Sequence, residues 1–274
     1  HKDRLTNPLI RKDGKLTECS WEEAYEVIDF NRKKTLTEKG GAGFAGLSSA
    51  RTTNEDNYLF QKMVRVGFQT NSVDHCARLW HASTVAGLAT MLGSGAMTNS
   101  IGEVINNDTI FVIGSNTTET HPVIGASIKQ AVRKGAKLIV ADPVKIKLAE
   151  IADCYLQIQP GSNTALLNGM INYIIENNLQ ASEYIRKKVN NFEFLKETVK
   201  EYTIEKTSKI CGVKPELIAK AAKIYADSPA AGLYYAMGIT QHSTGVDNVK
   251  SCVNLALTCG NIGKANAGIN PLRG

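Results

Sequence analysis

The sequence predicts an α/β protein built around a doubly wound parallel sheet. From about residue 76 onward, apolar segments of strand length alternate with segments of helix length, which is the order typical of β-α-β units. Small and polar residues follow directly after four of the predicted strands. Because ligands bind beyond the carboxyl ends of the strands in such sheets, both observations indicate a ligand-binding α/β domain.

The composition is that of a folded protein with a sizeable core. Of its 274 residues, 43% are apolar and 21% are charged, enough for one large domain or two smaller ones. No segment reaches the ~20 consecutive apolar residues of a membrane-spanning helix. The net charge of +6 is spread without a basic run, and only 7% of residues are aromatic. We therefore expect an anionic ligand or partner rather than nucleic acid.

Cysteine usage and the chain ends bear on location and completeness. Six cysteines are scattered without any C-x-x-C pair, which predicts reduced, mostly buried thiols in a cytoplasmic protein. The chain opens on His1 without a signal-peptide pattern and stops within the pattern "NPLRG". We expect it to be a piece of a longer polypeptide.

The first 75 residues predict a small α/β arrangement. Two short strands flank the turn at Asp13-Gly14, and a helix starts at about Ser20, where Ser20 and Glu23 fit a capping box. Residues 41–50 form a small, apolar run typical of a strand, and the next helix has Asn54 as its expected N-cap.

The later segments carry the parallel-sheet pattern. Strands are expected within 109–116, 136–143, 154–163 and 230–241, and helices within 121–135, 144–153, 164–178 and 247–263. A charged helical insertion is expected at roughly 181–227.

The four loops after these strands are candidate ligand contacts. They contain Gly114-Ser115-Asn116, Ala141-Asp142-Pro143, Gly161-Ser162-Asn163 and Gly238-Ile239-Thr240-Gln241. Glycine lets a backbone approach a ligand, helix N-termini bind phosphate, and an acid such as Asp142 suits a ribose diol or a purine edge. Each loop alone is equally explained as a turn, but four in register favour a nucleotide-like ligand. No G-x-G-x-x-G follows the first strand, which argues against an ordinary NAD site.

Two histidines remain ambiguous at this level. His121, at a helix start, is either a structural group or a ligand contact, and the residues before it cap the helix, contact the ligand or do both. The stretch "DHCARLWHASTVAGL" places Cys76 and His81 five residues apart. Without a third ligand, this pair does not predict a classical zinc site.

Six motifs along the chain indicate a resemblance to a known family. They resemble the molybdopterin oxidoreductases, and in particular the catalytic alpha subunits of formate dehydrogenases; the motifs are "SSARTTNEDNYLFQKMVR" (48–65), "VDHCARLWHASTVAGLA" (73–89), "VIGSNTTETHP" (112–122), "ADPVKIKLAEIAD" (141–153), "QPGSNTALLNGM" (159–170) and "GNIGKANAGINPLRG" (260–274).

The resemblance implies domains and cofactors. Residues 1–75 resemble part of a discontinuous α/β domain, and residues 76–274 resemble the Rossmann-like domain that binds molybdopterin guanine dinucleotide. Proteins of this kind carry bis-molybdopterin guanine dinucleotide with molybdenum or tungsten. They oxidise formate to CO2 or run the reverse, and they pass electrons to a [4Fe-4S] cluster in an N-terminal domain and to electron-transfer subunits. That cysteine-rich domain has no counterpart here, so we expect this chain alone to be inactive.

The resemblance also assigns site residues. The cofactor-binding positions it implies are Asn116, Glu119, Thr120, His121, Asp142, Pro143, Gly161, Asn163, Met237, Gly238 and Gln241.

At the reacting centre the matching positions are Trp80, His81 and Arg273. In the family the first is selenocysteine or cysteine and binds the metal, the histidine handles protons, and the arginine orients formate. A guanidinium suits a small carboxylate, and an imidazole suits a proton near neutral pH.

Trp80 departs from this pattern. An indole has only an N–H donor and cannot replace a thiolate or selenolate on a metal. Our hypothesis is that the native codon is UGA, which encodes selenocysteine in such genes and differs from the tryptophan codon UGG at one base.

Three alternatives stay open. The first is another molybdopterin oxidoreductase such as nitrate reductase, although His81 and Arg273 favour formate. The second is a non-catalytic scaffold subunit of the same fold. Trp80 suits it, but the retained histidine and arginine do not. A generic nucleotide-binding module would leave the "CARLWH" match unexplained.

Overall fold

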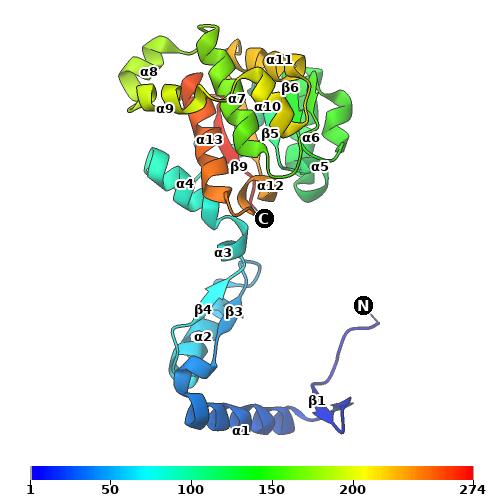
Figure 1. The fold of residues 1–274 in the computed structure, drawn as a ribbon. Coiled ribbons are helices and arrows are strands. Elements are labelled where there is room, and N and C mark those ends of the chain that lie inside the picture. Colours follow the sequence, from blue (N-terminus) through cyan, green and yellow to red (C-terminus); the bar gives the residue numbers. More distant parts are fainter. Residues whose placement is uncertain (1, 274) are drawn as a thin grey trace. The chain divides into compact units, whose positions relative to one another are not determined.

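The computed structural model describes residues 2–273 and divides the chain into two compact units, His1–Arg78 and Leu79–Gly274. Figure 1 shows the elements of both. That the units correspond to the two domains expected from the sequence, with their boundary after residue 75, stays a prediction.

Unit 1 opens with the expected hairpin and helix. Strands β1 (Leu9–Lys12) and β2 (Lys15–Glu18) pair antiparallel. Asp13 and Gly14 both have positive φ values, as a two-residue I′ turn requires. Helix α1 (Trp21–Lys39) begins after the N-cap Ser20, whose Oγ accepts a hydrogen bond from the Glu23 amide at 3.2 Å. The predicted N-cap is therefore confirmed, although the Glu23 carboxylate pairs with Lys12 at 2.6 Å, and only the Ser20 half of the predicted capping box is found.

The rest of unit 1 is a small parallel β-α-β arrangement. Strand β3 (Gly46–Ser48), helix α2 (Asn54–Lys62) and strand β4 (Val73–His75) follow one another, and the two strands pair in parallel. The expected N-cap at Asn54 is wrong by one residue. Thr53 has the extended backbone of a cap, and its Oγ1 accepts from the Asp56 amide at 3.2 Å.

Unit 2 contains a five-stranded, fully parallel sheet. Its strands are β5 (Thr109–Ile113), β6 (Lys137–Ala141), β7 (Cys154–Leu156), β8 (Ala231–Tyr235) and β9 (Gly268–Pro271). Their order is β7-β6-β5-β8-β9. The α/β fold class predicted from the sequence is confirmed. Strand β9 was missed, because four residues of mixed polarity carry no clear strand pattern.

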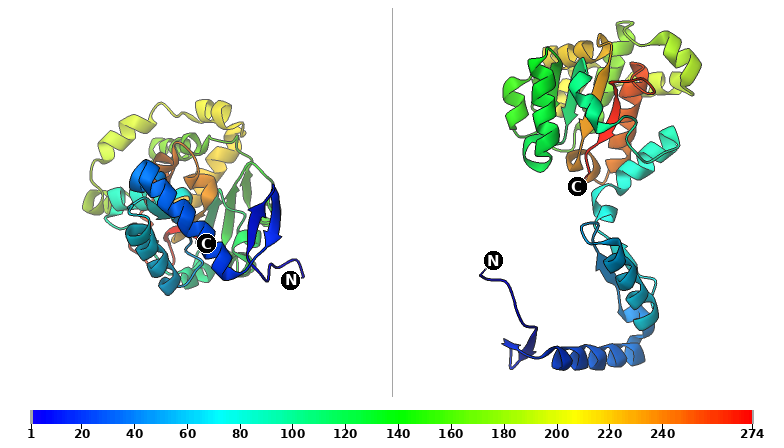
Figure 2. Two further views of the ribbon diagram at one scale, coloured as in Figure 1. Left: turned by 90° about the horizontal axis from the view of Figure 1, so that it is seen from below. Right: turned by 180° about the vertical axis from the view of Figure 1, so that it is seen from behind.

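Helices cover both faces of this sheet, as the views in Figures 1 and 2 show. Alternate side chains of β5 pack into two different cores. Phe111 and Ile113 belong to one core together with residues of α4 (Ala82–Leu92), α7 (Asn163–Glu176), α11 (Pro215–Ala226) and α13 (Gly245–Thr258). Ile110 and Val112 belong to the other, with residues of α6 (Pro122–Arg133) and the 3-10 helices Ile101–Asn106 and Lys147–Ile151.

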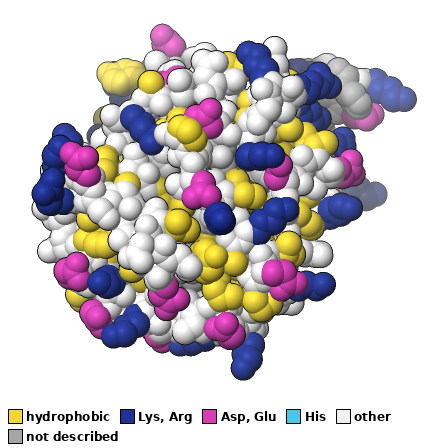
Figure 3. All heavy atoms as spheres, turned by 90° about the horizontal axis from the view of Figure 1, so that it is seen from above, with side chains coloured by type: hydrophobic (Ala, Val, Ile, Leu, Met, Phe, Trp, Pro, Cys, Tyr) yellow, Lys and Arg dark blue, Asp and Glu magenta, His cyan; other side chains and the backbone are white. Residues whose placement is uncertain are grey.

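The segment expected as a charged insertion is partly core. It comprises α8 (Ser182–Lys188), α9 (Phe192–Val199), α10 (Ile204–Cys211) and α11. Ile218, Ala221 and Tyr225 of α11 are fully buried, so this last helix is a structural layer of unit 2. On the face that Figure 3 shows, basic and acidic side chains are interspersed. Among the described residues, no helix is both long and apolar enough to cross a membrane.

Candidate cofactor and substrate site

The topological switch point of unit 2 lies between β5 and β8. The chain runs from β5 toward β6 on one side, and β8 continues toward β9 on the other, so the loops after β5 and β8 diverge there. Gly114 follows β5, and Gly238 lies in the short helix α12 (Met237–Thr240) after β8. The Gly238 amide donates to the Gly114 carbonyl at 3.0 Å. A Cβ on Gly238 would stand 2.6 Å from the Gly114 Cα, so only glycine permits this approach.

The loop after β5 is organised around Asn116. Its carbonyl accepts from the amides of Glu119 and Thr120, both at 3.0 Å, in the one-turn helix α5 (Thr117–Thr120). Glu119 and Thr120 are exposed. Glu119 and Thr120 thus present their side chains to solvent, while Asn116 and His121 are half-buried.

His121 joins this loop to the C-terminal segment. Its Nε2 lies 3.1 Å from the carbonyl oxygen of Arg273, and its Nδ1 lies 2.9 Å from Thr120 Oγ1. A carbonyl only accepts, so Nε2 is the protonated nitrogen in this bond. The sequence left the role of His121 open; the structure gives it a structural contact to the predicted formate-binding residue.

The loop after β6 holds a half-buried carboxylate. Asp142 Oδ1 accepts from the Val144 amide at 2.9 Å, and the Asp142 carbonyl accepts from the Tyr155 hydroxyl at 3.1 Å. Burial raises the pKa of the Asp142 carboxyl group, and the bond from Val144 partly offsets this. The Pro143 carbonyl accepts from Gln157 Nε2 at 3.1 Å. Such an acid at a strand end is suited to hydroxyl or amine donors of a nucleoside.

Gly161 lies in the loop before α7, and Asn163 is the first residue of that helix. Gly161 has a φ of 85°, and a Cβ there would meet nothing within 4 Å, so its backbone conformation is what requires glycine. Asn163 is buried, and its Nδ2 donates to the Gly238 carbonyl at 3.3 Å. This side chain ties the loop after β7 to the switch point.

Helix α12 and the residue after it hold the backbone of residues 79 and 80. Gln241 Nε2 donates to the Leu79 carbonyl at 3.1 Å, and Thr240 Oγ1 donates to the Trp80 carbonyl at 2.6 Å. Met237 begins this helix, and its carbonyl accepts from the Gln241 amide at 2.9 Å. Sequence reasoning missed Thr240 as a contact of this segment, because its partner is a distant backbone carbonyl.

Trp80 and His81 link helix α3 (Ala77–Trp80) to α4. The Trp80 and His81 rings stack with centroids 6.3 Å apart and planes inclined by 20°. His81 is buried. Its Nδ1 lies 3.0 Å from Thr84 Oγ1, and its Nε2 lies 3.1 Å from the Leu272 carbonyl. Burial, followed by the positive charge of Arg273, lowers the pKa of His81 to about 4.

Arg273 is exposed, and its guanidinium donates to the Gly95 carbonyl. The His81 contact to the neighbouring Leu272 therefore brings the segments of residues 80–81 and 272–273 together. His121, Gln241 and Gly238 connect to the same region through the bonds above. Asp142 and Pro143 lie at the next strand end, and their recorded bonds stay within that loop and β7.

Metal donors are scarce here. Among residues 2–273, no three His, Cys, Asp or Glu side chains gather closely enough to hold a metal ion. The close glycine contact at the switch point and the half-buried Asp142 suit a nucleotide-like ligand, whose identity stays a prediction. Trp80 does not fit the metal, because indole has no soft anionic donor.

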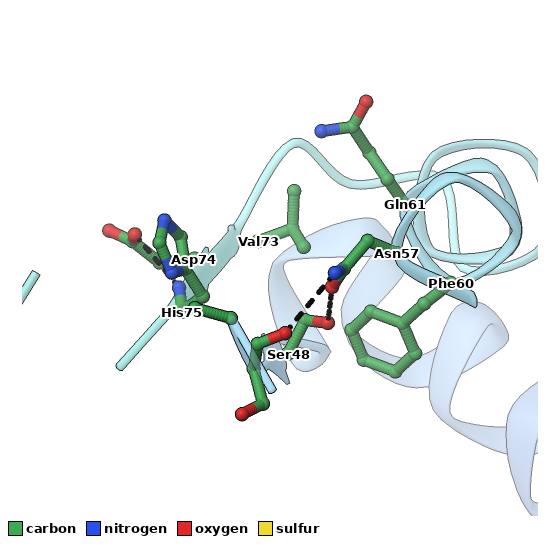
Figure 4. Close-up of a pocket in the computed structure, with 9 residues that line it drawn as sticks. Ser48, Asn57, Phe60, Gln61, Val73, Asp74 and His75 are labelled. Carbon is green, nitrogen blue, oxygen red and sulfur yellow. Dashed lines mark hydrogen bonds between the residues drawn. The ribbon is translucent and has the colours of Figure 1, made fainter. Parts of the chain in front are cut away.

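A pocket lies within unit 1, at the carboxyl ends of β3 and β4 (Figure 4). Asn57 accepts from the Ser48 hydroxyl and donates to the Ser49 carbonyl at 3.1 Å. Asp74 accepts from Arg78 Nε at 2.7 Å and from the His75 amide, and these bonds lower the pKa of its carboxyl group. Sequence reasoning did not single out this pocket as a site, although its residues lie in two of the family-like motifs.

Comparison with known proteins finds relatives over almost the whole chain. The chain is 52% identical over 272 residues to the F420-dependent formate dehydrogenase 1 subunit alpha of Methanococcus maripaludis, a match covering 99% of this chain and 40% of that protein. It is 42% identical over 275 residues to formate dehydrogenase H of Escherichia coli, covering 99% of this chain and 38% of that protein. The chain thus spans about two fifths of the length of these relatives.

The fold matches a solved structure as well. Acetylene hydratase from Pelobacter acetylenicus superposes with a TM-score of 0.80 and 26% identity, over 96% of this chain and 36% of that one. The family model described as molybdopterin oxidoreductase matches residues 4–273. Membership of this family implies a molybdenum or tungsten pterin cofactor. The family model and the identity to these relatives therefore establish that this chain belongs to the molybdopterin oxidoreductase family.

Proposed function

We propose that the full polypeptide represented by this chain is a formate dehydrogenase catalytic subunit. The observation that carries the proposal is the His81–Leu272 hydrogen bond at 3.1 Å. It joins the segment of residues 80–81 to the segment that contains Arg273. The relatives named formate dehydrogenase support the same reading at 42% and 52% identity. The fold alone does not choose the reaction, since a hydratase shares it.

The reaction sets what the residues must do. Formate loses one proton and two electrons to become CO2, and the pterin-bound metal, when bound, supplies the acceptor for the electrons. Arg273 is the group to hold the formate carboxylate. A guanidinium has five N–H donors, so its bond to the Gly95 carbonyl leaves donors for both carboxylate oxygens. Its positive charge also favours binding of the formate anion over binding of neutral CO2.

The strand-end loops would hold the nucleotide part of the cofactor. We propose a bis-molybdopterin guanine dinucleotide, which Asp142 and the loops of Asn116, Gly161 and Gly238 would hold when it is bound; the Asp142 carboxylate would accept hydrogen bonds from its guanosine. The finer features of this proposal are a [4Fe-4S] cluster, electron-transfer subunits and a cytoplasmic location. They rest on the family resemblance.

Trp80 occupies the proposed metal-ligand position. We propose that a selenocysteine encoded by UGA stands there in the native enzyme. Sequencing codon 80 of the natural gene tests this directly: a UGG codon would contradict it.

The function is tested on the full-length subunit carrying Trp80→Cys, produced in a host that makes the cofactor. We expect metal and pterin to co-purify with it and formate to reduce a viologen dye, while the 274-residue chain alone gives no dye reduction. The matched control is the same enzyme with Trp80 retained, in which Trp80 supplies no ligand to the metal. Nitrate-dependent oxidation of reduced dye without any activity on formate would instead assign a nitrate reductase.

A non-catalytic scaffold is the second candidate, and Trp80 is the observation that favours it. In that case the Trp80→Cys enzyme would bind neither metal nor pterin, and codon 80 would be UGG.

A further inference from the structure

Two buried hydroxyl groups outside the proposed catalytic residues form a chain of hydrogen bonds that ends at His81. Thr84 Oγ1 lies 3.0 Å from His81 Nδ1, and the Tyr235 hydroxyl donates to Thr84 Oγ1 at 3.2 Å. Thr84 and Tyr235 are completely buried. Tyr235 ends β8, while Thr84 lies in the first turn of α4, so the three side chains connect two elements of the sheet domain.

The direction of each hydrogen bond follows from its partner. The Leu272 carbonyl can only accept, so His81 Nε2 carries a proton and donates at 3.1 Å. The Tyr235 hydroxyl donates to Thr84, and the single Thr84 hydroxyl proton is then free to be donated to Nδ1. All bonds run in one direction, from Tyr235 through Thr84 to the His81 ring and on to Leu272.

We propose that Thr84 and Tyr235 are positioning residues that hold His81 as its Nε2–H tautomer, and that His81 in turn holds the backbone preceding Arg273; this rests on the assignment of Arg273 to formate binding. Both ring nitrogens are occupied by protein partners. His81 therefore acts as a fixed link between the segment of residue 80 and the backbone before Arg273, rather than as a mobile proton carrier. The bond from His81 to Leu272 joins residues that are 191 positions apart in the sequence.

The first test needs neither cofactor nor formate. Nitrogen-15 NMR of the histidine-labelled 274-residue chain distinguishes a protonated from an unprotonated ring nitrogen, and the His81 signals are assigned by their loss in His81→Gln. We expect a protonated Nε2 with a slowly exchanging proton and an unprotonated, hydrogen-bonded Nδ1. A protonated Nδ1 with a bare Nε2, or rapid averaging of the two tautomers, would overturn the proposal.

Variants with matched controls test the two hydroxyl groups. Thr84→Val keeps the shape but removes the donor, so the Nδ1 resonance should move toward that of an unbonded nitrogen, while Thr84→Ser should restore it. Thr90→Val, at an exposed position of the same helix, should leave it unchanged. Tyr235→Phe should produce a smaller shift than Thr84→Val, and Tyr234→Phe none, since Tyr234 bonds Asn107 instead. Equal effects of Thr84→Val and Thr90→Val would count against the proposal.

Kinetics of the full-length Trp80→Cys enzyme separate positioning from proton transfer. We expect Thr84→Val to raise the KM for formate roughly three- to tenfold and to change kcat less than about twofold, with Thr84→Ser close to the parent. A loss confined to kcat would assign His81 to the chemical step and overturn the positioning role. If no variant oxidises formate, the proposed function fails while the NMR result still decides the tautomer.

Discussion

The two units of the molecule differ in how much their elements depend on a core. In unit 2, side chains on both faces of the sheet are fully buried, among them Phe111, Leu138 and Tyr235. Among the described residues of unit 1, only Ala24 and Val64 are buried apolar side chains, while Trp21 and Phe30 of α1 are more than half exposed. The helices and the hairpin of unit 1 carry local cap and turn signals but bury few side chains, whereas the elements of unit 2 also pack into cores on both faces of the sheet. Four predictions test this contrast.

The largest effect is expected from removing one phenylalanine ring in each unit. Phe111 is 0% exposed and Phe30 is 68% exposed. Phe111→Ala should cost about 3–5 kcal/mol, because it loses buried area and leaves a cavity. Phe30→Ala should stay within about 0.5 kcal/mol. Urea unfolding, monitored by hydrogen exchange in peptides from β5 and α1, measures the cost of each substitution. Equal costs would abolish the contrast.

The buried histidine of unit 2 predicts a dependence of stability on pH. The His81 pKa falls from 6.5 to about 4 on folding, so between these values the unfolded chain binds more protons. Stability from this group is therefore complete above about pH 6.5 and declines as the pH falls toward 4, by at most about 3 kcal/mol. Urea unfolding at several pH values should show this decline in the wild type and a reduced one in His81→Gln. Superimposable profiles would refute it.

Two glycines with positive φ separate backbone strain from steric contact. Gly114 has a φ of 59° and lies against Gly238, whereas Gly14 has a φ of 79° with nothing within 4 Å. Gly14→Ala should cost about 1–2 kcal/mol from the left-handed backbone alone. Gly114→Ala should cost more, because the two loops must also move apart. Thermal unfolding followed by circular dichroism tests this, and a smaller loss for Gly114→Ala would contradict the close approach.

The smallest effect concerns helix caps. Ser20 caps α1 in unit 1, and Thr203 caps α10 in unit 2 by accepting from the Lys206 amide at 3.3 Å. Each cap is worth about 1 kcal/mol. Ser20→Ala should speed amide exchange in the first turn of α1 roughly fivefold. Thr203→Ala should have less local effect, because Thr207 and Cys211 anchor α10 in the core. A larger local effect in α10 would show that its packing contributes little.

Prediction from the sequence succeeded where the signal is local. The Asp13-Gly14 turn, the Ser20 cap and the strand of residues 109–113 depend on residues within a few positions of one another. The N-cap of α2 is Thr53 and not the predicted Asn54. Both residue types are good caps, so only the backbone conformation selects between them. The strand-end loops of the site were also predicted correctly, since the topology of a parallel sheet places them at one edge. The cofactor and catalytic roles of their residues stay predictions.

The sequence by itself determined the fold class, the strand-end loops, the family motifs and the tryptophan at position 80. Only the tertiary structure decided that β9 completes the sheet, that α11 lies in the core, and that Thr84 and Tyr235 reach His81. The physical reason is the distance along the chain. A hydrogen bond such as that from His81 to Leu272 joins residues 191 positions apart. No local periodicity encodes a contact that forms only after the layers have packed.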